Sequence, residues 1–192
     1  MPANTCTILQ ASLAWCQGTP ESPGLRRRLY YISKGLISAW PTLPKDAQGR
    51  ITSAVYQGSF TLAADATWKY IDILPSKSQL TSEAQGEAPS QTQLNKLTAL
   101  HPGVGEAASA AAAYINNNDN VYVVQDMKGK WRVVGSEEWE TVSTVAQDLG
   151  QGPTGATSTT IEVEATDHCP APFYVGTLET EDGTIQCGPT NP

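Results

Sequence analysis

The feature that most constrains this chain is an apolar segment that folds back on itself between residues 121 and 135. It reads VYVVQDMKGKWRVVG, and the turn Met127-Lys128-Gly129-Lys130 separates two runs rich in valine and aromatic residues. Such residues favour strands, and a short glycine-containing turn between them is typical of an antiparallel hairpin. An isolated hairpin is only marginally stable in water, so the rest of the chain must supply a sheet that covers it.

Directly before this hairpin, residues 105–115 predict a single helix. The segment is rich in alanine, the best helix former, and Glu106 lies in the first turn, where the helix dipole favours an anion. Asparagines at 116–118 tolerate the left-handed conformation that ends helices. Tyr114 and Ile115 are its only large anchors, so we expect the smooth remainder to pack closely against a sheet or a neighbouring subunit.

Residues 103–108, GVGEAA, match the glycine pattern of dinucleotide-binding turns, and Asp126 lies near the position of a ribose-binding acid. The context excludes this reading. Pro102 separates the preceding strand from the glycines, and Glu106 would put a negative charge where a pyrophosphate binds. After Asp126 the chain makes a hairpin, whereas a parallel sheet needs a helical crossover. We expect no nucleotide site.

Composition and residue alternation predict a mainly β protein with many turns. Sixteen glycines and 13 prolines punctuate the chain. Strands are predicted at 25–33 and, with apolar and polar residues alternating, at 160–166. Residues 51–75 also alternate, but the phase slips at Tyr70-Ile71, which predicts two consecutive segments or a projecting hairpin. Residues 136–150 fit either a helix or a strand, with strand slightly favoured.

The chain length is that of one domain. We expect an N-terminal arm at 1–24, where prolines and glycines prevent regular structure, and a β domain at 25–183. Within that domain, residues 76–91 lack apolar periodicity and predict a long surface loop, either a subunit contact or simply mobile. Residues 184–192 form a C-terminal tail.

The net charge of −7 is unevenly distributed. Residues 1–75 hold seven Lys/Arg against four Asp/Glu, and residues 76–192 hold five against fifteen. This argues against binding to the outside of a nucleic acid duplex, because that binding rests on neutralising phosphates. The run Arg26-Arg27-Arg28 favours a solvated strand end or salt bridges to acidic neighbours over a phosphate site.

The cysteines and histidines predict neither a metal site nor a cofactor. No cysteine pair has metal-ligand spacing, and His168 and Cys169, as sequence neighbours, are poorly placed to ligate one zinc ion. A chain of this size needs no disulfides, so we expect free thiols. The residues concerned are Cys6, Cys16, Cys169, Cys187, His101 and His168.

Catalysis is not expected either. Glu162 and Glu164 lie on one face of a predicted strand and could in principle form a catalytic carboxylate pair, but nothing else supports a sugar-cleaving site. The glycine-rich residues 151–157 lack the Gly-Lys-(Ser/Thr) ending of a phosphate-binding loop. Residues 8–15 are too short and polar for a secretory segment, and no run is long enough to span a bilayer. We therefore expect a non-enzymatic protein without a membrane contact.

Four strings carry a resemblance to a known family: Leu100-His101-Pro102-Gly103, and residues 121–135, 150–155 and 159–176. Together with the order of elements, they resemble the major tail tube proteins of long-tailed bacteriophages. The resemblance implies an antiparallel β-sandwich or open barrel with one flanking α-helix, extended arms and a loop. Copies of this domain, six to a ring, would join their inner strands into one continuous barrel. The rings would stack into a tube through which DNA, and perhaps a tape-measure protein, passes without specific binding.

The resemblance also implies partners, a location and surfaces. The partners would be other copies of the chain and possibly tape-measure, tail terminator and baseplate proteins. The location would be the virion tail, assembled in the host cytoplasm. Acidic residues facing the lumen would repel DNA, with Asp65, Asp72, Glu162 and Glu164 as candidates. Subunit contacts would come from the arm, the loop, the tail and, as candidate residues, from Leu80, Glu83, Glu87, Tyr114 and Ile115.

The alternative is a monomeric β-sandwich binding module, or another virion surface protein, with a carbohydrate or protein ligand. Tryptophans can form a stacking platform for sugars. Most of the five lie within apolar alternation, which favours core packing. They are Trp15, Trp40, Trp68, Trp131 and Trp139.

Overall fold

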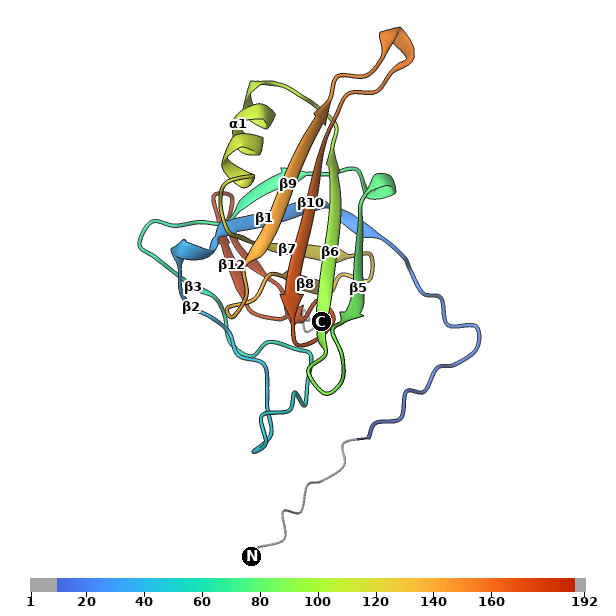
Figure 1. The fold of residues 1–192 in the computed structure, drawn as a ribbon, viewed down its shortest axis with the longest axis vertical. Coiled ribbons are helices and arrows are strands. Elements are labelled where there is room, and N and C mark those ends of the chain that lie inside the picture. Colours follow the sequence, from blue (N-terminus) through green and yellow to red (C-terminus); the bar gives the residue numbers. More distant parts are fainter. Residues whose placement is uncertain (1–9, 189–192) are drawn as a thin grey trace, which may run out of the picture.

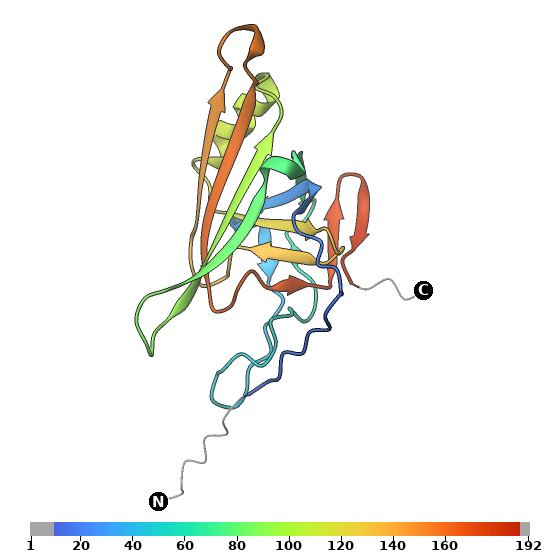
Figure 2. The ribbon, with the colours of Figure 1, turned by 90° about the vertical axis from the view of Figure 1, so that its right-hand side faces the viewer.

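The strands of this computed structural model, which describes residues 10–188, form two main antiparallel sheets packed face to face (Figure 1). The predicted fold class is confirmed: the protein is mainly β and sandwich-like, with a single α-helix and no closed barrel within residues 10–188. The strands of one sheet run across those of the other (Figures 1 and 2).

The first sheet has five strands, and the expected hairpin lies within it. Its order is β11-β8-β7-β1-β4. In the β7–β8 turn, the Asp126 carboxylate accepts the N–H of Lys130 at 2.9 Å, and Gly129 has a φ of 86°. The strands are β1 (Leu25–Ser33), β4 (Lys69–Asp72), β7 (Asn120–Asp126), β8 (Trp131–Val134) and β11 (Phe173–Tyr174).

The second sheet has four strands in the order β5-β6-β10-β9. Residues 136–150, whose sequence fits a helix or a strand and slightly favours a strand, contain β9, in agreement with the β-prone run around Val142. The predicted strand at 160–166 is the middle of β10. The strands are β5 (Gln79–Gln85), β6 (Thr92–His101), β9 (Thr141–Asp148) and β10 (Ser158–Asp167).

Both faces of the five-stranded sheet are buried at its centre, along β7. Tyr122 and Val124 of β7 face the four-stranded sheet and pack among residues such as Leu97 and Ile161. Val121 and Val123 point the other way, into a second core built with the aromatic residues of the 40–68 segment and with the segment from 174 to 187. Burial on both sides explains why β7 reads as a continuous apolar run, without alternation.

Two small ribbons and short 3₁₀ turns complete the fold. Residues 51–75 contain two short strands, β3 and β4, separated by a turn in which Asp65 has a φ of 60°. The prediction of two segments is confirmed, but their break lies before β4, and Tyr70 and Ile71 are consecutive residues within that strand. The ribbons are β2 (Ile37–Ala39) with β3 (Thr61–Leu62), and β12 (Thr177–Thr180) with β13 (Gly183–Gln186). The 3₁₀ turns are Lys34–Leu36, Pro75–Lys77 and Gly152–Thr154.

The helix α1 (Glu106–Ile115) is confirmed and lies beside β9 (Figure 1). Ile115 is its one buried residue, whereas Tyr114 is 48% exposed. Just past the helix, the Asn116 side chain accepts the N–H of Val145 at 2.7 Å and donates to the same residue's carbonyl at 3.5 Å. The helix is therefore attached to the outer edge of β9 through a side-chain amide that bonds to the strand as the backbone of a neighbouring strand would.

Two boundary predictions are wrong. The expected loop at 76–91 contains β5, which pairs with β6 along its whole length. The expected tail begins too early, since residues 184–186 belong to β13 and pair with β12; residues 189–192 lie outside the described part. Both errors concern edge strands, which bury little apolar surface and so leave little periodic signal. Residues 10–24 of the predicted arm contain no regular element and extend away from the sheets (Figure 2).

Candidate functional site

The outward face of the four-stranded sheet is a broad polar surface. Ile161, Val163 and Ala165 of β10 point to the core, which leaves Glu162 and Glu164 outward. The register places Glu164 opposite Lys96 of β6 and Val142 of β9. The inward–outward alternation of an antiparallel sheet thus creates one apolar and one solvated face.

Negative charge dominates this face. Lys96 Nζ lies 2.6 Å from Glu83 Oε1 and 3.8 Å from Glu164 Oε1. Its hydrogen bond with Glu83 is the main reason why the pKa of Lys96 is raised. Glu162 has no salt bridge among the described residues. The outward side chains of these four strands include four carboxylates and one lysine: Glu83, Asp148, Glu162, Glu164 and Lys96.

One edge of this sheet, formed by β5, is open. Leu100 of β6 directs its backbone groups to the β5 side, where its N–H donates to Ser78 Oγ and its carbonyl accepts from Leu74. Because facing backbone groups alternate along an antiparallel pair, those of Leu80, Ser82 and Ala84 point to the open edge. Within residues 10–188 these outward groups have no hydrogen-bond partner.

The opposite edge, formed by β9, is partly closed. The same alternation directs the backbone of Thr141, Ser143, Val145 and Gln147 outward. The side chain of Asn116 hydrogen-bonds to the outward backbone groups of Val145, and the N–H of Thr141 donates to Asp119 Oδ1 at 3.0 Å. The outward backbone groups of Ser143 and Gln147 have no partner in the described part of the chain. A strand from outside can therefore pair with β9 only where Asn116 does not already do so.

The four acidic residues expected to line a lumen lie on two different parts of the molecule. Glu162 and Glu164 share the outward face of the four-stranded sheet. Asp65 lies in the turn before β4, and Asp72 is the last residue of β4, in the other sheet. Asp72 is also paired with Arg28 at 3.2 Å. Arg28 itself contacts Asp182 at 3.3 Å, so the predicted salt bridges are confirmed for Arg28, whereas Arg26 and Arg27 are solvent-exposed.

Of the five candidate subunit-contact residues, two pack against other residues of the same chain. Ile115 is 1% exposed, and Leu80 packs against the core between the sheets. This is a correction, because the sequence does not reveal which way these apolar side chains face. Glu83, Glu87 and Tyr114 are exposed. In addition, Leu13 and Trp15 of the arm are 97% and 64% exposed.

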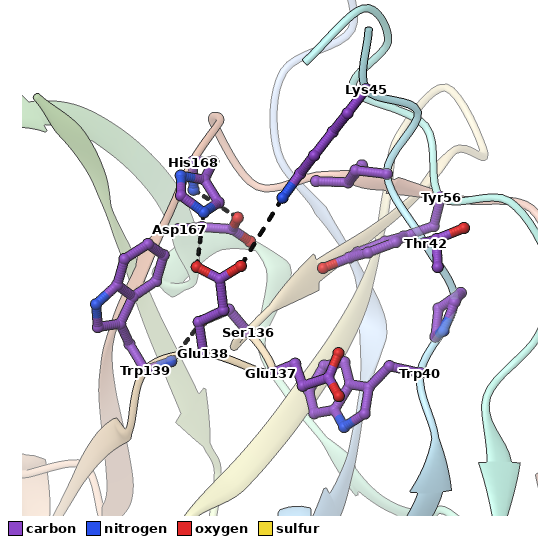
Figure 3. A pocket seen from close by; sticks show the side chains of 12 residues that line it. Trp40, Thr42, Lys45, Tyr56, Ser136, Glu137, Glu138, Trp139, Asp167 and His168 are labelled. Carbon is purple, nitrogen blue, oxygen red and sulfur yellow. Dashed lines mark hydrogen bonds and ion pairs between the residues drawn. The ribbon is translucent and has the colours of Figure 1, made fainter. Parts of the chain in front are cut away.

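A pocket of about 230 Å³ lies where the 40–57 loop meets the β8–β9 connection and the end of β10 (Figure 3). Tyr56 is positioned by its N–H, which donates to the carbonyl of Phe173 at 2.9 Å. Ser136 Oγ donates to the carbonyl of Thr166 and accepts the N–H of Trp139, which holds the β8–β9 connection against β10. Trp40 and Trp139 form part of the wall.

Charged groups from three segments converge in this pocket (Figure 3). The carboxylate of Glu138 lies 2.7 Å from His168 Nε2 and 3.8 Å from Lys45 Nζ. Asp167 is 2% exposed; its Oδ1 accepts the N–H of His168 at 2.6 Å, and its Oδ2 has no hydrogen-bond partner within residues 10–188. Burial raises the pKa of Asp167 to about 6 against that hydrogen bond, and burial also raises the pKa of Tyr56.

The tryptophans and thiols mostly follow expectation. Trp68 and Trp131 are buried in the core, as predicted, whereas Trp15 is exposed and Trp40 and Trp139 line the pocket. Cys16, Cys169 and Cys187 are free thiols, and Cys6 lies outside the described residues. Burial raises the pKa of Cys169 and Cys187 to about 12, so both are protonated at neutral pH.

Sequence reasoning missed the pocket. Its charged residues come from positions 45, 137–138 and 167–168, and no motif joins them. The one available signal was Asp167, a carboxylate at the inward phase of the alternating strand that precedes His168.

Within residues 10–188, no cluster of His, Cys, Asp and Glu is arranged to hold a metal ion, and no helix is long and apolar enough to cross a membrane. No protein-family model, curated protein or solved structure matches the chain.

Proposed function

We propose that this protein is a virion structural subunit, the tail tube protein of a long-tailed phage. Its four-stranded sheet would join with the sheets of other copies to line the tube. The observation that carries the proposal is the combination of an acidic outward face with an open β5 edge and free positions on β9. A sheet of this form is incomplete as a monomer, because unpaired edge groups invite another strand.

The geometry of a closed ring is consistent with the passage of DNA. Six copies of four strands make a 24-stranded barrel. With strands ~4.8 Å apart and tilted by ~40°, such a barrel is about 48 Å across between backbones. That leaves room for a DNA duplex between the side chains of opposite walls. Glu162 and Glu164 would face the lumen, where an excess of carboxylates repels phosphates and keeps DNA from adhering.

The other contacts would come from exposed apolar residues outside the sheets. Leu13 and Trp15 of the arm are exposed, and an extended segment that leaves its own domain can bind a neighbouring copy. The arm would then connect subunits or rings, while the sheet edges close each ring. Removal of residues 1–24 should leave the domain folded and weaken assembly, as measured by sedimentation of assembled material against monomer.

The direct test is electron microscopy of purified protein across a concentration series. We expect rings or tubes of uniform width. A second experiment uses the variant Ala84→Pro. The substitution removes a backbone N–H that points to the open β5 edge, so it blocks the addition of a strand without breaking a hydrogen bond to β6. This variant should keep the monomer's melting temperature and form no tubes.

A matched control is Ala47→Pro, the same substitution in the turn closed by the Gly49 N–H to Asp46 carbonyl bond, where proline is favoured. It should assemble like the unmodified protein. Monodisperse monomers at every concentration would contradict the proposal and favour the monomeric binding module. Tubes formed equally well by Ala84→Pro would remove the assignment of β5 as the joining edge.

A further inference from the structure

The pocket in Figure 3 contains a buried carboxylate oxygen that has no hydrogen-bond partner in the described part of the chain. Asp167 Oδ2 lies in a side chain that is 98% removed from solvent, and only the other oxygen of that carboxylate is hydrogen-bonded. Unpaired buried carboxylates are costly, so a group of this kind in a native structure calls for a partner. Figure 3 shows the carboxyl groups of Asp167 and Glu138 pointing into the space bounded by Lys45 and Tyr56.

The charges already present do not supply this partner. The side chains of Lys45 and His168 both contact Glu138, and neither of these side chains makes a hydrogen bond or salt bridge with the carboxylate of Asp167. The one contact from His168 to that carboxylate is its backbone N–H, which Oδ1 accepts. Glu137, a further lining residue, has no ion pair among the described residues. The pocket therefore contains two uncompensated carboxylates when Asp167 is ionised. A neutral ligand such as a sugar would leave that charge unbalanced, whereas a cation would neutralise it.

The walls suit a delocalised or compact organic cation. Trp40, Trp139 and Tyr56 present aromatic rings to the space, and aromatic faces attract cations. The volume of about 230 Å³ is several times the ~30 Å³ that a water molecule occupies in the liquid, so a small organic group has room.

We propose that this pocket is a binding site for a single guanidinium or ammonium group, with Asp167 as the buried counter-charge and Trp40, Trp139 and Tyr56 as the surrounding wall. The group is either a free organic cation or the end of a lysine or arginine side chain from another copy. Arg26 and Arg27 are exposed and form no salt bridge within the described residues, so another copy has cationic side chains to offer. The pocket holds a cation whether or not the chain assembles.

The test uses the full chain and two probes of nearly identical shape, methylguanidinium and its uncharged counterpart N-methylurea. Binding is followed by tryptophan fluorescence at pH 8 and checked by calorimetry. Methylguanidinium should give a saturable change with a dissociation constant on the order of 1 mM. N-methylurea should give none. Equal binding of both probes, or no saturable response to methylguanidinium, would overturn the proposal.

Variants locate the site. Asp167→Asn should weaken methylguanidinium binding by about tenfold or more, since it removes the buried charge. Lys45→Met should strengthen it several-fold, because a competing ammonium is lost. Glu87→Gln, an exposed carboxylate in the β5–β6 connection, is the matched control and should bind like the unmodified protein. Unchanged binding in a folded Asp167→Asn would contradict the assignment.

A measurement on the unmodified protein covers the case in which Asp167→Asn does not fold. Burial raises the pKa of Asp167 to about 6, so affinity should fall by about tenfold between pH 8 and pH 5. The other ionisable groups near this carboxylate are Glu137, Glu138, Lys45, His168, Tyr56 and Cys169. Burial raises the pKa of Tyr56 and of Cys169, so both stay protonated between pH 5 and pH 8. The profile is therefore repeated in His168→Gln, where the loss should persist; its disappearance would assign the effect to His168 and contradict the proposal.

The two sources of the cation are separated by comparing monomer with assembled protein. If assembled tubes no longer respond to methylguanidinium while monomers do, a side chain of a neighbouring copy fills the pocket. If both respond equally, the natural ligand is a free cation. Both results support a cation site, and the first also supports the proposed assembly. Absence of tubes would contradict the proposed function alone and leave the monomer titration decisive for the site.

Discussion

The two main sheets differ in what surrounds them. The five-stranded sheet is covered on both faces, and Val121, Val123, Tyr122 and Val124 are all fully buried. The four-stranded sheet is covered on one face; Val142 on its other face is 62% exposed, and its β5 edge is open. The first sheet therefore holds the monomer together, while the second has a face and an edge that remain available to other molecules.

The largest effect is expected in the second core, which covers the face of the five-stranded sheet that points away from the four-stranded sheet. Trp68 is 1% exposed and packs on Phe60 with ring centroids 5.3 Å apart. Trp68→Ala should lower the free energy of unfolding by about 3–5 kcal/mol, because it leaves a large cavity. Urea denaturation measures this. Trp15→Ala, at a 64% exposed position, is the control and should change it by less than ~0.5 kcal/mol. Similar losses in both would contradict the burial assignment.

The four-stranded sheet, which is covered on one face only, also carries a buried carboxyl group. This group belongs to Asp167, the last residue of β10. Its pKa is raised from 3.8 to about 6, so the folded state holds a proton that the unfolded state has already lost between these values. Stability therefore falls as pH rises from about 4 to 6, and the full penalty applies above that range. Relative to Asp167→Asn, the unmodified protein should lose about 3 kcal/mol of unfolding free energy over this interval.

Parallel pH series of urea titrations on the two proteins provide the measurement. The comparison cancels the contributions of the other titrating groups. Identical pH profiles would show that Asp167 is ionised in the fold at pH 5 and would remove the basis for this prediction.

A matched pair of valines compares the two sheets directly. Val123 is fully buried in β7, and Val142 is exposed on β9. Val123→Ala should cost about 1.5–2.5 kcal/mol, since two methyl groups leave a well-packed core. Val142→Ala should change the unfolding free energy by less than ~0.5 kcal/mol. If the exposed substitution instead destabilised the monomer as much as the buried one, the outward face would not be free.

The smallest effect is expected at the charged network on the outward face. Lys96 contacts Glu83 and Glu164, but all three side chains are at least 40% exposed. Exposed pairs of this kind contribute little, so Lys96→Met should alter the melting temperature only slightly, by the equivalent of ~0.5 kcal/mol or less. A calorimetric shift several times larger would mean that this face contributes to the stability of the monomer.

How well each segment could be predicted from the sequence depends on how much local signal that segment carries. The β7–β8 hairpin, the alternating strand β10 and the alanine-rich helix were predicted because propensity, periodicity and turn residues agree there. β5 was missed because an edge strand with one buried face has a polar composition that resembles a loop. The pocket was missed because its charged residues are close only after the 40–57 loop packs against the end of β10.

By itself, the sequence determined the strand-rich class, the helix and the hairpin, because these depend on neighbours within a few positions along the chain. Only the tertiary structure decided which apolar side chains face inward, so that Ile115 is buried, Leu80 packs against the core and Trp15 stays exposed. It also decided that the Asp167 carboxylate is buried without gaining a hydrogen-bond partner for Oδ2 among the described residues. Burial and pairing depend on segments far apart in the sequence, and local patterns carry no record of which segments meet.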